Sequence, residues 1–114
     1  MAGQVIFLPE FINYLDELSF ILYESGYFGF KDSAKKYTDK IFDFCQQYVG
    51  ILTGKSAPAY FNRYGINMKY ITYRPNKQTA WYIFYQQYED KYLVRYITNN
   101  HVATQYFAED WKTA

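Results

Sequence analysis

The stretch NMKYITYRPNKQTAWYIFYQQYEDKYLVRYITN, residues 67–99, decides the fold. It is rich in β-branched and aromatic residues, and two short polar segments, 75–78 and 89–90, interrupt it. Such runs predict three strands, over 66–74, 79–88 and 91–98. The short polar turns between them predict that consecutive strands pair antiparallel. Because tyrosine recurs on both faces of these strands, the pattern leaves open which face is buried.

The residues before this stretch predict one strand and two helices. Residues 4–8 (QVIFL) form a short apolar run, and Pro9 suits the first turn of a helix because it has no amide hydrogen to lose. Apolar residues recur at helical spacing over 9–25, and again from Asp32 or Ser33 to Tyr48. Residues 50–65, rich in Gly, Ser and Pro, predict a loop. Residues 102–111 fit either a short helix or an extended tail.

This order of elements predicts an α+β fold in which a helical hairpin packs on one face of a mostly antiparallel four-stranded sheet. Residues 5–8 supply the fourth strand, and a short C-terminal helix or tail follows. At 114 residues the chain is expected to form a single domain over 1–114. The other face of the sheet is then free for function. If Trp81, Ile83 and Tyr85 face the helices, Tyr82, Phe84 and Gln86 line the open face; the reverse assignment is the alternative.

Composition excludes several classes of site. The single cysteine, Cys45, cannot form an internal disulfide and lies in an apolar stretch, which predicts a buried side chain. One His and one Cys far apart do not make a ligand set, so no metal is expected, and no cofactor motif is present. The sequence has no apolar run of membrane length and no charged-then-apolar leader, so we expect a cytoplasmic protein without a membrane partner.

Charge is unevenly distributed along the chain. Residues 1–50 carry four Lys and seven Asp or Glu, whereas residues 51–108 carry seven Lys or Arg and two acids. Cations pair with phosphates and aromatic rings stack on bases, so a basic aromatic sheet indicates RNA as a partner. The alternative is that the aromatic residues form the core and that the charges are ordinary solvated faces.

The order of elements at this length resembles the RelE/ParE superfamily of toxins from bacterial type II toxin–antitoxin systems. The strongest segments are 81–85 (WYIFY), 92–97 (YLVRYI) and 99–101 (NNH). The resemblance implies a partner, the cognate antitoxin protein, and a metal-independent endoribonuclease that acts on messenger RNA in the ribosome. A ParE-like, non-enzymatic inhibitor of DNA gyrase and a member that has lost activity remain open. The chain has Tyr82 where RNA-cleaving members often carry arginine.

Candidate site residues follow from the chemistry of RNA cleavage. A base removes the proton of the ribose 2′-hydroxyl, a cation stabilises the phosphate and an acid protonates the leaving 5′-oxygen. Histidine is the side chain whose unperturbed pKa lies near neutral pH, and the resemblance places a functional residue in the loop of His101. Each candidate also has a structural alternative, as a surface histidine, a tyrosine that anchors the tail, or a solvated charge. The candidate catalytic residues are His101, Tyr106, Tyr82 and Arg95, and the candidate RNA-binding residues are Arg63, Lys69, Arg74, Lys77 and Gln86.

Overall fold

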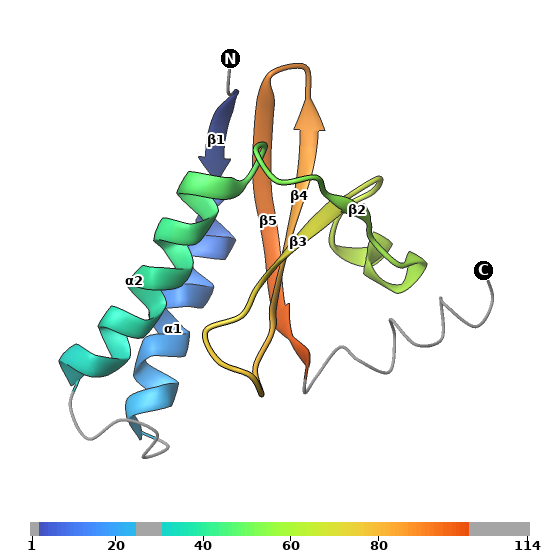
Figure 1. The fold of residues 1–114 in the computed structure, drawn as a ribbon. Coiled ribbons are helices and arrows are strands. Elements are labelled where there is room, and N and C mark those ends of the chain that lie inside the picture. Colours follow the sequence, from blue (N-terminus) through green and yellow to red (C-terminus); the bar gives the residue numbers. More distant parts are fainter. Residues whose placement is uncertain (1–2, 25–30, 101–114) are drawn as a thin grey trace.

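A computed structural model describes residues 3–24 and 31–100 (Figure 1). The elements in chain order are β1 (Gln4–Phe7), α1 (Pro9–Glu24), α2 (Lys31–Tyr48), β2 (Lys55–Ser56), the 3-10 helix η1 (Ala59–Tyr64), β3 (Lys69–Tyr73), β4 (Trp81–Tyr88) and β5 (Lys91–Asn99). The predictions for the C-terminal helix or tail, His101 and Tyr106 lie outside the described residues.

The strands form one sheet in the order β1-β5-β4-β3-β2. The pairs β3–β4 and β4–β5 are antiparallel, as predicted, whereas β1 runs parallel to β5 from Gln4 beside Lys91 to Phe7 beside Val94. The α+β class and the mostly antiparallel sheet are confirmed. The predicted count of four strands is wrong, because Lys55 and Ser56 in the predicted loop pair with β3 as a short fifth strand.

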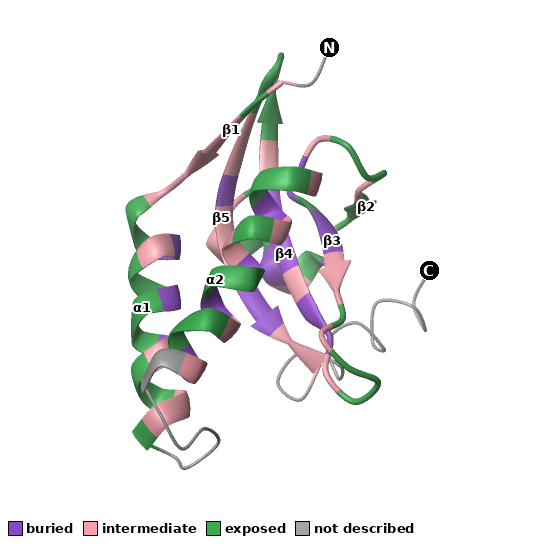
Figure 2. Ribbon diagram, turned by 60° about the vertical axis from the view of Figure 1, so that its left-hand side comes forward, coloured by how far each residue is buried: buried purple, intermediate pink, exposed green. Residues whose placement is uncertain are grey.

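The two helices form an antiparallel hairpin that covers one face of the sheet (Figures 1 and 2). Their buried residues recur at helical spacing: Phe11, Leu15 and Leu18 on α1, and Ala34, Ile41 and Cys45 on α2. Because these buried residues face the sheet, the charged residues on the opposite side of each helix face solvent. Between α2 and the sheet, the Trp81 indole Nε1 donates a hydrogen bond to the Tyr37 hydroxyl at 2.9 Å.

The two faces of β4 pack in two separate hydrophobic cores. Trp81, Ile83 and Tyr85 pack in the core beneath the helices, which confirms the first of the two predicted alternatives. The opposite face is not open in its middle, because η1 places Phe61 on Phe84 with ring centroids 4.5 Å apart. Burying one such side chain contributes about 1.5–3 kcal/mol. The prediction of a wholly free face is therefore wrong, since the stretch predicted as a loop carries its own apolar cluster.

Candidate functional site

A β-bulge in β5 sets the position of Arg95. Phe84 pairs with Tyr96 and Tyr85 pairs with Val94, so Arg95 has no partner of its own on β4. A bulge bends its strand and re-aims the side chain that it carries. Here the Arg95 Nε donates to the Tyr64 carbonyl oxygen at 3.2 Å, and its Nη1 donates to the Gln86 Oε1 at 3.3 Å.

The chain that follows η1 packs directly on this arginine. The Gln86 Nε2 donates to the Ile66 carbonyl oxygen at 2.8 Å, so one amide side chain contacts both Arg95 and the returning backbone. A Cβ atom at Gly65 would lie 3.0 Å from the Arg95 Nε and 3.0 Å from the Met68 sulfur. Glycine therefore permits the close approach that places the Tyr64 carbonyl over the guanidinium.

Arg63, in the last turn of η1, is fixed in a similar way. Its guanidinium carbon lies 4.0 Å from the centre of the Tyr60 ring, and its Nε donates to the Tyr60 carbonyl oxygen at 3.1 Å. Stacking on an aromatic face holds an arginine without neutralising its charge. Across residues 3–24 and 31–100, the ion pair that forms is Lys35–Asp39, so neither Arg63 nor Arg95 is paired with a carboxylate there.

Both arginines line one cleft of about 410 Å³ between α1, the end of η1 and β5. The cleft lies at the outer edge of β5, since β1 ends at Phe7 beside Val94 whereas β5 continues to Asn99. Pro9 starts α1 and so ends the strand early. The remaining lining residues are Glu10, Phe11, Tyr14, Tyr64, Tyr96 and Ile97.

Tyrosines form the aromatic wall of the cleft. The rings of Tyr64 and Tyr96 stack with centroids 4.0 Å apart and planes 6° from parallel. Burial, together with the hydrogen bond to Tyr64, raises the pKa of Tyr96 above its ordinary value. Burial also raises the pKa of Tyr14. These hydroxyls are therefore neutral near physiological pH and can donate hydrogen bonds to an anion held by the arginines.

No known family model, curated protein or solved structure matches this chain. Its function is therefore inferred from the chemistry of the cleft. The cleft combines two guanidinium groups that form no ion pair with a described carboxylate, the carboxylate of Glu10 and tyrosine hydroxyls. Two guanidinium groups at one cleft can bind a phosphate or a carboxylate, because the planar guanidinium donates two parallel hydrogen bonds to either group.

The structure brings together three of the predicted site residues. Arg63 and Arg95 line the cleft, and Gln86 accepts a hydrogen bond from Arg95. Tyr82 packs edge-on against Tyr70, with centroids 5.8 Å apart, and does not line the cleft.

The other predicted cations lie elsewhere. Lys69 lines a separate polar hollow beside Asn67, Gln87 and Glu89. Arg74 and Lys77 are exposed beyond the other end of β3. A single phosphate therefore cannot reach all of the predicted cations.

Sequence reasoning missed Glu10, Tyr14, Tyr64 and Tyr96. An acid in the first turn of a helix is common because it complements the helix dipole, so Glu10 gave no functional signal. The three tyrosines are hidden among the 15 in the chain. Only the register of β5 and the path of η1 bring Tyr64 and Tyr96 together.

Two kinds of feature are absent from the described residues. Residues 3–24 and 31–100 contain no group of three or more His, Cys, Asp or Glu side chains placed to hold a metal ion. None of the described helices has the length and apolar character required to cross a bilayer.

Proposed function

We propose that this protein is the toxin of a type II toxin–antitoxin system and that it cleaves messenger RNA on the ribosome without a metal ion. The fold supports the family resemblance on which the proposal rests. A sheet that left residues 5–8 unpaired, or a helix across 80–97, would have argued against it. Instead β1 pairs with β5, and residues 81–99 form two strands.

The observation that carries the proposal is the pair of arginines at one cleft. Each guanidinium is fixed by a backbone carbonyl, at Tyr60 for Arg63 and at Tyr64 for Arg95, and neither has a carboxylate partner in the described chain. Cations fixed before the substrate arrives need little reorganisation to stabilise the negative charge that develops on a phosphate. This arrangement suits a phosphodiester bound between α1 and η1.

The lining residues supply further parts of the reaction. The ribose 2′-oxygen attacks phosphorus and gives up its proton, the bond to the 5′-oxygen breaks, and a 2′,3′-cyclic phosphate forms. Arg63 and Arg95 stabilise the phosphate, and Glu10, the carboxylate that lines the cleft, accepts the proton. The leaving 5′-oxygen takes a proton from an acid, and in this scheme His101, a candidate general base or general acid, supplies it. Tyr64 and Tyr96 offer ring faces for a neighbouring base.

The test is cleavage of messenger RNA on translating ribosomes, followed by mapping of the new ends. We expect the unaltered protein to cleave, and Arg63→Gln to lower the rate about 10²–10³-fold, the loss typical of removing one preorganised charge-stabilising group. Lys36→Gln is the matched control, because it removes an exposed cation on α2, outside the cleft.

A parallel assay of DNA supercoiling by gyrase separates the competing function. Inhibition of supercoiling without RNA cleavage would replace the endoribonuclease by a gyrase inhibitor. Equal RNA cleavage by Arg63→Gln and Lys36→Gln would leave an endoribonuclease but remove the cleft from its mechanism.

A further inference from the structure

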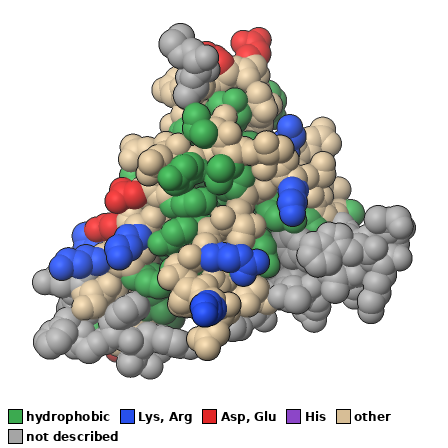
Figure 3. Space-filling model, in the orientation of Figure 1, with side chains coloured by type: hydrophobic (Ala, Val, Ile, Leu, Met, Phe, Trp, Pro, Cys, Tyr) green, Lys and Arg blue, Asp and Glu red, His purple; other side chains and the backbone are tan. Residues whose placement is uncertain are grey.

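Arg95 is held in place by the fold, unlike an ordinary surface cation. On the face that carries α2 and β3, Lys and Arg side chains stand out into solvent (Figure 3), and Lys35 on α2 has 69% of its side chain exposed. Arg95 is half-buried, and its Nε and Nη1 both donate hydrogen bonds to the protein. Within the described residues its Nη2 makes no hydrogen bond, so this end of the guanidinium remains for a ligand in the cleft.

Gln86 joins Arg95 to the chain that leaves η1. Its Nε2 donates to the Ile66 carbonyl oxygen at 2.8 Å, and its Oε1 accepts from the Arg95 Nη1 at 3.3 Å. Arg95 in turn donates through Nε to the Tyr64 carbonyl oxygen at 3.2 Å. These bonds close a ring through Tyr64, Arg95, Gln86 and Ile66, and Arg63 directly precedes Tyr64 in the sequence. The ring therefore fixes Arg95 relative to the segment that carries the other arginine of the cleft.

A side chain that closes this ring needs both a donor and an acceptor. The amide of Gln86 has both, and the bond from its Nε2 to Ile66 turns its Oε1 toward Arg95. Glutamate at this position would still accept from Arg95, but its charge would neutralise the guanidinium. Alanine would leave the Arg95 Nη1 and the Ile66 carbonyl without these partners.

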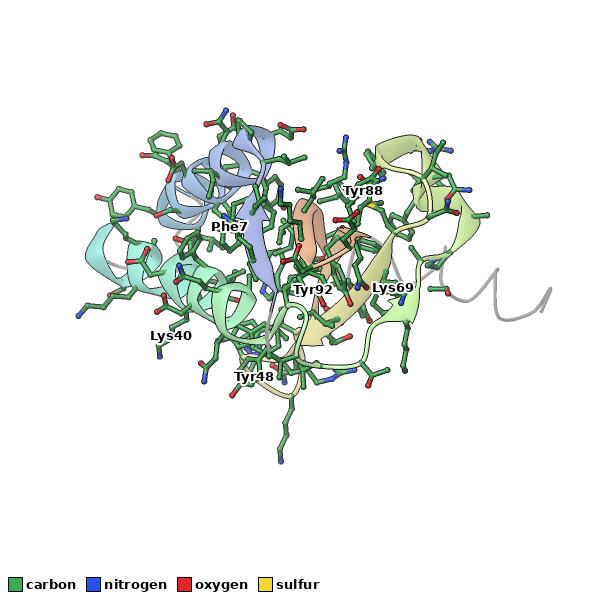
Figure 4. The ribbon with its side chains drawn as sticks, turned by 90° about the horizontal axis from the view of Figure 1, so that it is seen from above. Phe7, Lys40, Tyr48, Lys69, Tyr88 and Tyr92 are labelled. Carbon is green, nitrogen blue, oxygen red and sulfur yellow. The ribbon has the colours of Figure 1, made fainter. Side chains whose placement is uncertain are left out.

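The next residue, Gln87, provides a matched comparison. Adjacent residues of a strand point to opposite faces, and Gln87 lines the polar hollow that contains Lys69. Its Nε2 donates to the Glu89 carbonyl oxygen at 3.2 Å. Lys69 lies across the sheet from Phe7, where β1 ends (Figure 4). Gln87 is thus the same kind of side chain, on the same strand, without a contact to the cleft.

We propose that Gln86 is a positioning residue, which orients Arg95 so that the guanidinium Nη2 faces an anionic group in the cleft. Gln86 does not line the cleft, and its amide is engaged within the protein at both its nitrogen and its oxygen. A side chain that is already immobilised loses less conformational entropy when the ligand binds. The inference rests on the arginine cleft of the proposed function, but not on RNA cleavage.

The first measurement is NMR of the arginine side chains in the full-length, ¹⁵N-labelled protein. A guanidinium held by hydrogen bonds rotates slowly about its C–N bonds, so we expect resolved Nη signals for Arg95. These signals should be averaged in Gln86→Ala but kept in Gln87→Ala and in Gln86→Glu. Inorganic phosphate should shift the Arg95 signals at a concentration at least threefold lower in the original protein than in Gln86→Ala. Arg95 signals and phosphate responses that are the same in both would overturn the inference, whether or not the protein cleaves RNA.

The second measurement is binding of a fluorescein-labelled 2′-O-methyl oligo(U), followed by fluorescence anisotropy. This probe cannot be cleaved because its 2′-oxygen is blocked. We expect Gln86→Ala to weaken binding about three- to tenfold, the cost of ordering one arginine side chain. Gln86→Glu should weaken it at least tenfold because it also cancels the charge, and Gln87→Ala less than twofold. If the original protein does not bind the probe, the proposed function fails, and the phosphate titration still decides the inference.

A double-mutant cycle separates positioning from direct contact. In an Arg95→Gln background, Gln86→Ala should change the affinity less than twofold, because the residue through which it acts is gone. An equal effect in both backgrounds would overturn the inference, since Gln86 would then contact the RNA itself or hold η1 independently of Arg95. Equal affinities of Gln86→Ala and Gln87→Ala would overturn it as well.

Discussion

Arg95 links three parts of the chain through two hydrogen bonds. Its Nε is bound to the Tyr64 carbonyl at the end of η1, and its Nη1 is bound to Gln86 on β4. Arg95→Ala removes both donors and leaves these partly buried groups unsatisfied, which costs about 1–3 kcal/mol per group left without a partner. We expect a loss of that order in the free energy of unfolding, measured by urea denaturation.

The control for Arg95→Ala is Arg74→Ala. Arg74 is exposed at the end of β3, and its replacement should stay within about 0.5 kcal/mol of the original protein. Equal stability of the two variants would show that the bonds of Arg95 add nothing to the fold. Arg95 would then serve binding alone.

Cys45 links stability to pH. It is completely buried on α2, and burial raises the pKa of its thiol from 9.0 to about 12. Between these values the unfolded chain releases the thiol proton while the folded chain keeps it. The contribution of Cys45 is therefore fully present below pH 9 and is lost as pH rises toward 12. The decline is at most about 1.4 kcal/mol per pH unit for one group.

The prediction for Cys45 is a difference in slope. Several buried tyrosines also have raised pKa values, so every version of the protein loses stability in alkali. We expect the urea midpoint of Cys45→Ala to fall less steeply between pH 8.5 and 10.5 than that of the original protein, whatever its value at pH 7. Parallel slopes would contradict the burial of this thiol.

At the scale of elements, Asn100 closes the end of the sheet. Its Oδ1 accepts a hydrogen bond from the Ala80 amide at 3.0 Å, and its Nδ2 donates to the Gln78 carbonyl oxygen at 3.1 Å. Ala80 is fully buried, so Asn100→Ala leaves its amide without that partner. We expect a loss of about 1–3 kcal/mol and faster hydrogen exchange at Ala80.

Asn62→Ala is the matched control for Asn100→Ala. Asn62 is exposed on η1, and its replacement should be close to neutral in the same urea titration. If both variants unfold at the same urea concentration, residues 78–80 are held by the β3–β4 pairing rather than by the side chain of Asn100.

The elements with regular periodicity were predictable from the sequence. Helical spacing and Pro9 correctly predicted α1, and alternation between polar turns correctly predicted β3, β4 and β5. β2 and η1 were missed, because a two-residue strand and a short 3-10 helix have too few residues to show a period. The stacking of Tyr64 on Tyr96 could not be predicted either, because it depends on the position of η1.

The candidate site was only partly predictable for a related reason. Arg63 and Arg95 were selected by charge, but their position at one cleft depends on the bulge at Arg95 in β5, opposite Phe84 and Tyr85. A bulge shifts register by one residue and leaves no clear mark in composition. Glu10 reaches the cleft only because β1 ends where α1 begins, which is a property of the chain path.

On the scale of the whole molecule, the charged side chains are distributed differently on the helices and on the sheet. The helical hairpin contains both signs, as the ion pair between Lys35 and Asp39 illustrates. Residues 51–100 carry seven Lys or Arg and two acids, Glu89 and Asp90, in the turn between β4 and β5. A polarised surface attracts a polyanion over distances near the Debye length, about 8 Å at physiological ionic strength. RNA should therefore approach the sheet side and the cleft rather than the helices.

This polarity predicts how RNA binding depends on salt. Each phosphate neutralised on a single strand contributes about −0.7 to the slope of log K against log salt concentration. If Arg63 contacts a phosphate, Arg63→Gln should make the slope for an oligo(U) RNA shallower by about 0.7. Lys36→Gln removes an exposed charge from α2 instead, and should leave the slope unchanged.

Fluorescence anisotropy from 50 to 300 mM salt, with both variants at equal folded concentration, measures the difference. Identical slopes for the two variants would place the RNA away from Arg63, and a slope near zero for all versions would remove the polarised surface as the cause of binding.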